Sequence, residues 1–227
     1  MSPTIRYTAV RPSTAAAPVE PTPSPIRRGA LHGLLVATLA GALPAAGSAA
    51  SPAVAAAGPD GFAPELRTRL LEGGCILLLR HAQTVSGIGD PPGFRIGDCA
   101  TQRNLSDEGR AQAERLGAAL RREGVPIGTV RSSRWCRCLD TARLAFGRVE
   151  PWPVIDSFFA ERAGSGPAQT AELRRWALAF RGPGNAALVT HQVNVTGLTG
   201  QWVASGELLV LAPEGDTLVL LGRLAPP

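Results

Sequence analysis

The sequence of 227 residues contains no lysine, so all 23 of its basic side chains are arginines. This absence excludes a phosphate-binding loop of the Walker type, in which a lysine reaches the phosphates. It also excludes any enzyme that forms a Schiff base through lysine. Hydrophobic residues make up 44% of the chain and charged residues 18%, which is typical of a globular protein and not of a disordered one.

The chain also lacks a strong excess of charge outside its N-terminal region. The formal net charge is +5, but only one acid, Glu20, precedes Asp60. The residues from Asp60 onward hold 19 arginines and 17 acids, a net charge of +2. A balance of this kind does not favour a surface for polyanions, so we expect no nucleic-acid partner. The arginines before Asp60 are Arg6, Arg11, Arg27 and Arg28.

No apolar run is long enough to span a bilayer. The apolar run 30–43 has 14 residues, fewer than the roughly 20 that a membrane-spanning helix needs. Arg27-Arg28 precede this run and small residues follow it, which together form the three parts of a secretory signal. We therefore expect residues 1–57 to be a signal peptide and disordered leader. The Arg27-Arg28 pair suggests that the chain is exported by the twin-arginine route. Residues 58–227 are then the folded domain, periplasmic or secreted, with no stable membrane span.

Apolar runs alternate with amphipathic segments through the predicted domain. The runs 75–79 and 186–190 are almost entirely apolar, as in strands that are buried on both faces. The alternation predicts an α/β fold, with a mostly parallel central sheet flanked by helices on both faces. Ligands of such folds bind at the carboxyl ends of the strands. The other expected strands are 128–132, 152–155, 207–211 and 217–221, and the expected helices are 106–122, 137–146, 169–180 and 193–199.

Histidine is scarce, and both histidines of the predicted domain directly follow an apolar strand. His81 follows Arg80 at the end of the first strand, and His191 directly follows the run 186–190. One such histidine would more often be a packed core residue, but two at equivalent strand ends indicate a site. Arg80 needs a partner, because burying an unpaired guanidinium is costly. No acid lies close to it in the sequence, so we expect a ligand anion.

A third feature that suits an anion follows the strand 128–132. Ser132-Ser133 lead into a helix that carries Arg137 near its start. Hydroxyls and free amides at the start of a helix suit an anion, and the guanidinium fork matches the oxygens of a phosphate. Arginine on a helix is by itself often a solvated charge. The hypothesis of an anion site therefore requires that Arg137 lies in the same cavity as the two histidines.

These residues resemble the motifs of the histidine phosphatase superfamily, which includes phosphoglycerate mutases and histidine acid phosphatases. The resemblance covers residues 75–221 and has one departure, Ala82 in place of the family's glycine, whose methyl would tighten the phosphate pocket. The motifs are Arg80-His81-Ala82 for Arg-His-Gly, Ser132-Ser133 with Arg137 and Thr141-Ala142 for the Ser-Ser…Arg-x-x-x-Thr-Ala motif, residues 104–113 for the opening of the following helix, and His191 for the closing histidine.

The resemblance implies a phosphatase in which His81 attacks phosphorus and forms a phosphohistidine that water then hydrolyses. Arg80, Arg137 and His191 would surround the oxygens of the transferred group. The substrate would be a small phosphorylated molecule, and neither a metal nor another cofactor would be required.

The leaving oxygen needs a proton, which a carboxylic acid commonly supplies. Three acids are candidates: Asp156, Glu161 and Glu207. Glu161 is favoured because Glu161-Arg162 resembles the Glu-Arg of the mutase branch. A surface charge is the alternative interpretation for each.

Four cysteines lie in the predicted domain, an even number that permits disulfides in an oxidising compartment. We expect a bridge between Cys99 and Cys136, because both flank segments that we place at the active site. Cys136 and Cys138 lack the two-residue spacing of a zinc knuckle, so no metal site is expected. Cys75 opens an apolar strand and is interpreted as a small buried hydrophobe.

Other functions are weighed against the phosphatase. A phosphomutase is disfavoured because export would separate it from its phosphosugar intermediates. A serine hydrolase with Ser132 and His191 lacks the Gly-x-Ser-x-Gly motif. The main alternative is a catalytically weak or inactive module of the same fold that binds phosphate or a phosphoglycan. Specificity would lie in segments 85–100 and 156–168, and nothing in the sequence indicates the oligomeric state.

Overall fold

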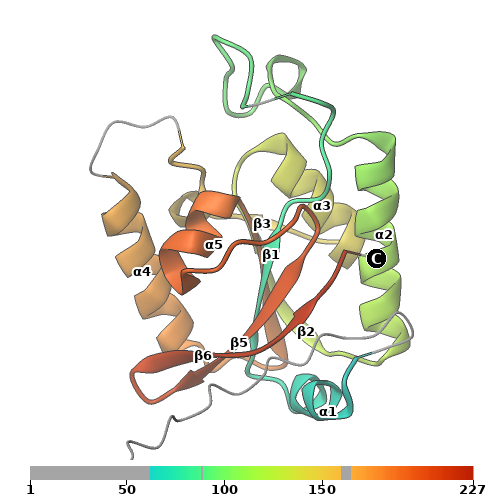
Figure 1. Ribbon diagram of the computed structural model, residues 1–227, viewed down its shortest axis with the longest axis vertical. Coiled ribbons are helices and arrows are strands. Elements are labelled where there is room, and N and C mark those ends of the chain that lie inside the picture. The colour runs from blue at the N-terminus through green and yellow to red at the C-terminus, as the bar shows by residue number, and fades with distance from the viewer. Residues whose placement is uncertain (1–61, 88, 160–164, 227) are drawn as a thin grey trace, which may run out of the picture. The chain divides into compact units, whose positions relative to one another are not determined.

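The computed structural model describes residues 62–87, 89–159 and 165–226 (Figure 1). The predicted leader, residues 1–57, lies outside these ranges. Within them, no helix has the length and apolar character needed to cross a membrane. The helices are α1 (Pro64–Glu72), α2 (Asp107–Arg122), α3 (Cys136–Phe146), α4 (Ser165–Ala179) and α5 (Gln192–Thr199), and the strands are β1 (Ile76–Arg80), β2 (Ile127–Ser132), β3 (Glu150–Pro151), β4 (Asn185–Thr190), β5 (Leu208–Glu214) and β6 (Thr217–Leu224).

Six strands form one mixed sheet in the order β3-β2-β4-β1-β5-β6. Strands β1, β2, β3 and β4 run parallel to one another, whereas β5 and β6 add an antiparallel edge. The predicted α/β fold with a mostly parallel sheet is therefore confirmed. The two strands that precede the histidines, β1 and β4, are direct neighbours, and Arg80 is in register with Thr190. This pairing brings His81 and His191 to the same edge of the sheet.

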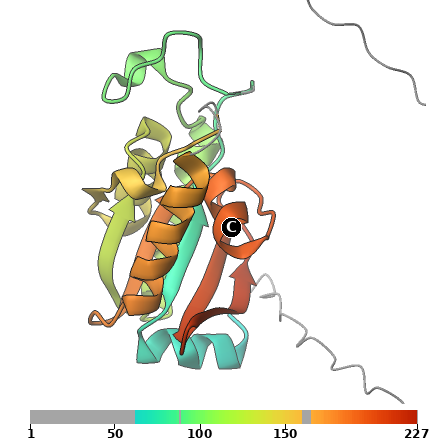
Figure 2. The ribbon, with the colours of Figure 1, turned by 90° about the vertical axis from the view of Figure 1, so that its left-hand side faces the viewer.

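Helices cover both faces of the sheet (Figures 1 and 2). On one face, Leu77 and Leu79 of β1 pack with side chains of α1, α2 and α3. On the other face, Ile76 and Leu78 pack with side chains of α4 and α5, among them Leu173. Because successive residues of a strand point to opposite faces, the apolar run of β1 contributes to both cores.

Helix α2 packs closely against the elements that carry the site. Ser106 caps its first turn, with the side chain accepting a hydrogen bond from the Gly109 amide at 3.0 Å. A Cβ at Gly109 would lie 1.8 Å from the carbonyl oxygen of Gln83, and one at Gly117 would lie 2.1 Å from that of Ala145 in α3. Glycine at these two positions allows α2 to approach the segment after β1 and the helix α3.

The structure differs from the elements predicted from the sequence in three places. The predicted strand 152–155 is wrong: Glu150–Pro151 form the edge strand β3, and Pro153–Ile155 form a 3-10 turn. Proline has no amide hydrogen to donate to a ladder, which favours a turn at Pro153. Helix α4 begins at Ser165, earlier than expected, and the sequence reasoning did not identify α1.

Candidate active site

A cavity of about 730 Å³ lies at the carboxyl ends of β1 and β4. Four of the residues singled out in the sequence line it: Arg80, His81, Arg137 and His191. We call these four residues the floor of the cavity. Five further lining residues are apolar or aromatic, and we call them the apolar wall: Phe94, Ile96, Trp135, Phe159 and Val193.

His81 is held at the end of β1 by its backbone and its ring. Its amide donates a hydrogen bond to Thr190 O at 2.9 Å, which continues the β1–β4 ladder by one residue. The ring Nδ1 lies 2.9 Å from Ala82 O, so it carries the proton that it donates to this carbonyl. Burial, with the nearby charge of Arg137, lowers the pKa of His81 to about 3. His81 is therefore neutral at physiological pH, with an unprotonated Nε2.

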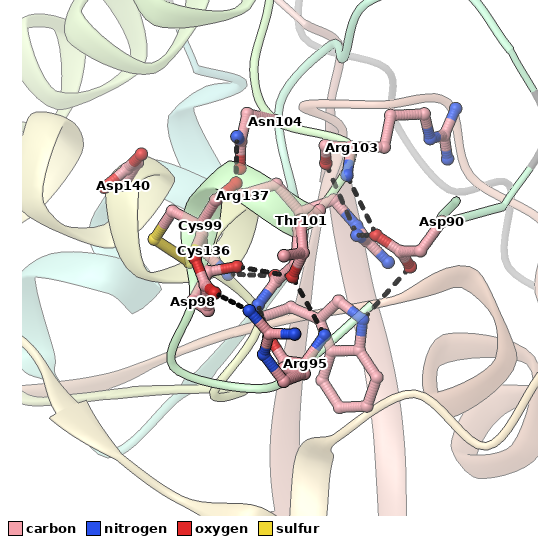
Figure 3. The surroundings of a disulfide bond; sticks show 12 residues. Asp90, Arg95, Asp98, Cys99, Thr101, Arg103, Asn104, Cys136, Arg137 and Asp140 are labelled. Atoms are coloured by element: carbon pink, nitrogen blue, oxygen red, sulfur yellow. Dashed lines mark hydrogen bonds and ion pairs between the residues drawn. A yellow bond between two sulfur atoms is a disulfide. The ribbon is translucent and has the colours of Figure 1, made fainter. Parts of the chain in front are cut away.

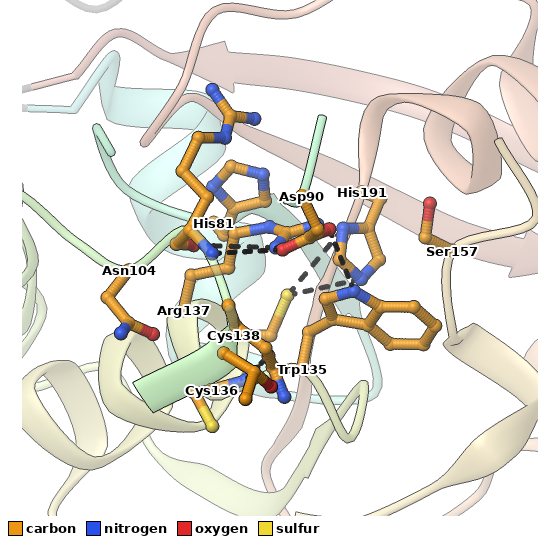
Figure 4. A network of polar contacts seen from close by, with 12 residues as sticks. His81, Asp90, Asn104, Trp135, Cys136, Arg137, Cys138, Ser157 and His191 are labelled. Carbon is orange, nitrogen blue, oxygen red and sulfur yellow. Dashed lines mark hydrogen bonds and ion pairs between the residues drawn. The ribbon is translucent and has the colours of Figure 1, made fainter. Parts of the chain in front are cut away.

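His191 lies beside His81, with 5.5 Å between the ring centroids (Figure 4). Its Nε2 is 2.8 Å from Ser133 Oγ and 3.5 Å from Cys138 Sγ. Burial, together with the positive charges of Arg137 and Arg80, lowers the pKa of His191 well below its usual value. The edge-to-face contact with Trp135, at 5.3 Å, fixes the imidazole from another side. The ring is thus buried, oriented and neutral.

Arg137 is paired with an acid that the sequence reasoning missed. Its Nη1 lies 2.7 Å from Asp90 Oδ1, and both side chains are more than nine-tenths buried. The same carboxylate accepts hydrogen bonds from the Arg103 amide and from Trp135 Nε1, each at 3.1 Å. Burial raises the pKa of Asp90, but the hydrogen bond and charge of Arg137 outweigh it and hold the pKa below its usual value. Asp90 is therefore an ionised partner of Arg137.

Three arginines crowd the cavity: Arg80, Arg103 and Arg137. Burial, together with the charges of the other two, lowers the pKa of Arg80. Among the described atoms, the Nε of each of these arginines is buried and has no hydrogen-bond partner. Unpaired buried donors of like charge are costly unless an anion joins them. The site is therefore suited to a ligand with several anionic oxygens.

Arg80 has protein partners that the sequence did not predict. Its Nη1 donates a hydrogen bond to Val203 O at 2.8 Å, and its guanidinium lies 5.7 Å from the ring centroid of Trp202. These contacts orient the side chain at the edge of the cavity.

Of the three acids proposed as proton donors, the two that the structure describes, Asp156 and Glu207, do not line the cavity. Asp156 accepts hydrogen bonds from Ser133 Oγ and from the amide and Nε of Arg134. Glu207 pairs with Arg223 at 3.1 Å and accepts from the Ala204 amide. Glu161 lies outside the described residues. Of the described acids, Asp90 is the one that lines the cavity.

The disulfide expected between Cys99 and Cys136 is present (Figure 3). It joins the loop after β1 to the first residue of α3, next to Arg137. The thiols of Cys75 and Cys138 are free and buried, and burial raises the pKa of Cys138 to about 12. Among the described residues, no group of three or more His, Cys, Asp or Glu side chains is placed to hold a metal ion.

The two serines ahead of α3 have different surroundings. Ser132 Oγ donates to the carbonyl oxygen of Ser133, away from His191. Ser133 Oγ contacts His191, but Ser133 is fully buried and does not line the cavity. The structure thus does not form the Ser132–His191 pair that a serine hydrolase would need.

Two cavity residues were not predicted as site residues. No feature of the sequence marked Arg103, whereas Asp90 belongs to the loop 85–100 in which we expected function.

The comparison with protein families adds to this geometry. Residues 76–172, which include β1, the loop and α3, match the model of the histidine phosphatase superfamily (branch 1). Residues 76–172 therefore belong to this superfamily. No curated protein sequence matches the chain significantly.

Two solved structures are similar to this histidine phosphatase superfamily member. One is a proposed alpha-ribazole-5'-P phosphatase from Escherichia coli, with 18% identity and a TM-score of 0.53. The other is the product of an open reading frame of Mycobacterium tuberculosis, with 18% identity and a TM-score of 0.50. Each alignment covers 64% of this chain and 94% of the other. At this identity the similarity establishes the fold alone.

The superfamily's Arg-His-Gly motif is Arg-His-Ala in this member. Ala82 is fully buried, packs in a small cluster with Leu105 and Ala113, and donates its amide hydrogen to Thr141 Oγ1 at 3.1 Å. It is not among the residues that line the cavity. The expectation that its methyl tightens the phosphate pocket is therefore wrong, because the methyl packs against the α2 side of the segment.

Proposed function

We propose that this protein is a phosphatase that hydrolyses a phosphomonoester through a phosphohistidine intermediate on His81. The observation that carries the proposal is the neutral His81 with its unprotonated Nε2, in one cavity with Arg80, Arg137 and His191. A nucleophile that is already deprotonated needs no base to activate it.

In the proposed reaction, His81 Nε2 attacks phosphorus as the ester P–O bond breaks, and the leaving oxygen takes a proton to form the alcohol. Water then attacks the phosphohistidine, the P–N bond breaks, and inorganic phosphate and His81 are released. The hydrogen bond from Nδ1 to Ala82 O stabilises the positive charge that the ring acquires in the intermediate. One difficult displacement is thus divided into two easier ones.

The floor supplies the charge that phosphoryl transfer requires. The guanidinium groups of Arg80 and Arg137 are donors for the oxygens of the transferred group, and His191 adds a third contact. Preorganised donors of this kind stabilise the transition state because they need no rearrangement during the reaction. We infer that these side chains perform the role without a metal ion.

Glu161 remains our proposal for the donor of the leaving-group proton. Asp156 and Glu207 are engaged in ion pairs away from the cavity, and three donors hold Asp90 in its ionised form. The segment that contains Glu161 follows Phe159, which lines the cavity.

Hydrolysis of p-nitrophenyl phosphate by the purified domain tests the proposal. We expect His81→Ala to lower kcat/KM by at least about 10³-fold. The chelator EDTA leaves the rate unchanged. Wild-type enzyme that is quenched in alkaline detergent should carry phosphate bound to nitrogen, a bond that survives base and is lost in acid. Wild type that binds inorganic phosphate in calorimetry but does not turn over the ester would instead be an inactive binding module.

We also propose that the domain acts in the periplasm or outside the cell. The leader pattern before residue 58 supports this, as does the Cys99–Cys136 disulfide, since such bonds persist in oxidising compartments. Cell fractionation that finds the chain in the cytosol with both thiols reduced would contradict it.

A further inference from the structure

The cavity is larger and more apolar than a phosphate requires. Its 730 Å³ is in the range of sites that enclose a whole small molecule. The arginines and histidines occupy the floor, and the apolar wall rises from four different segments of the chain. The part of the substrate beyond the phosphate must therefore lie against the wall.

Exposed hydrophobic side chains gather at the mouth of this cavity. Five large hydrophobic side chains are exposed among the described residues. Two of them, Phe159 at 71% and Ile96 at 42%, belong to the apolar wall. Trp202, at 68%, contacts the guanidinium of Arg80, and Val85 is two residues from the cavity-lining Gly87. Only Leu71, on α1 at the other end of the sheet, lies apart, and clustering of this kind marks a binding surface.

Apart from the arginines and histidines, most of the polar side-chain groups that line the cavity already have partners. Gln192 Oε1 accepts from the Val203 amide and contacts Arg80, and its Nε2 donates to Thr196 Oγ1 and Gln201 O. The Nε1 of Trp135 is held by Asp90. The hydroxyl of Ser157 remains, with its oxygen accepting a long hydrogen bond from the Phe159 amide.

This shortage of polar partners bears on the kind of alcohol that the phosphate esterifies. A sugar phosphate would bring several hydroxyls into the cavity, and each hydroxyl left without a partner costs free energy. An alkyl or aryl group has no such requirement and removes the exposed apolar surface from water.

We propose that the substrate is a phosphomonoester of an apolar alcohol. Its phosphate binds the floor, and its hydrocarbon part binds Phe94, Ile96 and Phe159 of the apolar wall. This inference rests on the phosphatase function proposed above. It assigns the apolar wall as the specificity-determining region of the cavity.

A series of n-alkyl phosphates from ethyl to octyl, each below its micelle concentration, tests the assignment. Their leaving groups have similar acidity, so changes in kcat/KM report contacts of the chain. We expect kcat/KM to rise about 2- to 4-fold for each methylene until the cavity is filled. Glucose 6-phosphate should be poorer than hexyl phosphate by on the order of 10²-fold.

Two surface variants and a matched control locate the effect. Ile96→Ser and Phe159→Ser should each reduce the slope of log kcat/KM against chain length, because each removes exposed apolar surface. Leu71→Ser, an exposed leucine on α1, should leave that slope unchanged. All three positions are exposed, so the variants should fold, which their Tm values verify.

A slope of zero in the wild type, or glucose 6-phosphate turned over as well as hexyl phosphate, overturns this assignment. An unchanged slope in both wall variants does so too. In each of these cases turnover of p-nitrophenyl phosphate persists, so the phosphatase proposal survives. Absence of all turnover in the wild type contradicts the phosphatase proposal itself.

Discussion

The floor and the apolar wall of the cavity are built in opposite ways. His81 and His191 of the floor are each 4% exposed and are anchored at the ends of adjacent central strands. Phe94 and Ile96 of the wall come from the glycine-rich loop after β1, in which Ile96 is exposed and which a disulfide joins to α3. Reacting groups need fixed geometry, whereas loops on a rigid scaffold tolerate change and carry specificity.

Asp90 connects the two regions. It comes from the loop, but its carboxylate binds Arg137 of the floor and Trp135 of the wall (Figure 4). The Cys99–Cys136 bridge joins the same loop to α3 one residue before Arg137 (Figure 3). Both the ion pair of Asp90 and the disulfide thus connect the loop to the floor, so substitutions in either region test how far the two depend on each other.

The largest effect is expected from the floor. Arg137→Ala removes a buried guanidinium and its free Nε, and kcat/KM for p-nitrophenyl phosphate should fall by about 10³-fold. Arg143→Ala is the matched control, because Arg143 is on the same helix but exposed, and it pairs with Asp140. Steady-state kinetics of the two variants, with Tm values for folding, checks this. Equal activity of the two variants would remove Arg137 from the floor.

A smaller effect is expected from the tether of the wall. Replacing Cys99 and Cys136 together by serine opens a loop of 37 residues and should lower the free energy of unfolding by about 3 kcal/mol. Because Phe94 and Ile96 of the wall lie in the tethered loop, whereas Arg137 is held in α3, KM for hexyl phosphate should rise more than kcat falls. Denaturant unfolding and steady-state kinetics measure both.

Reducing agent provides the control for the tether. It should destabilise the wild-type protein and leave the double-serine variant unchanged, because that variant has no disulfide to reduce. A fall in kcat with constant KM would mean that the tether serves the floor.

Near neutral pH the smallest effect is expected from protonation of the floor, and this effect grows as the pH is lowered. In the unfolded chain histidine binds a proton below pH of about 6.5, whereas in the folded chain the pKa of His81 is about 3 and that of His191 is also lowered. Between these values the unfolded state binds more protons. Stability is therefore greatest above pH of about 6.5 and falls as the pH is lowered, by up to about 1.4 kcal/mol per pH unit for each histidine.

Denaturant unfolding of residues 58–227 between pH 7 and pH of about 4.5 measures this decline. The variant His81→Asn/His191→Asn should flatten it, since both buried imidazoles are removed. An equally steep decline in this variant would assign the acid sensitivity to other groups.

Much of the fold was predictable from local pattern. The apolar runs of β1 and β4 alone indicate strands buried on both faces, and the histidine after each strand follows from the order of residues along the chain. Prediction failed where local pattern is weak: the strand expected at 152–155 is a proline-started turn, and the edge strand β3 has only two residues. Short edge elements are decided by their neighbours and not by their own composition.

The candidate site divides in the same way. The sequence by itself determined that Arg80, His81, Arg137 and His191 follow or adjoin strand ends, because parallel strands bring their carboxyl ends to one edge. Only the tertiary structure decided that Asp90 pairs with Arg137, 47 residues away, that Arg103 joins the arginines, and that Ser133 and not Ser132 contacts His191. Such contacts depend on how a long loop folds over the sheet. The local sequence pattern does not determine which residues that are far apart along the chain come into contact.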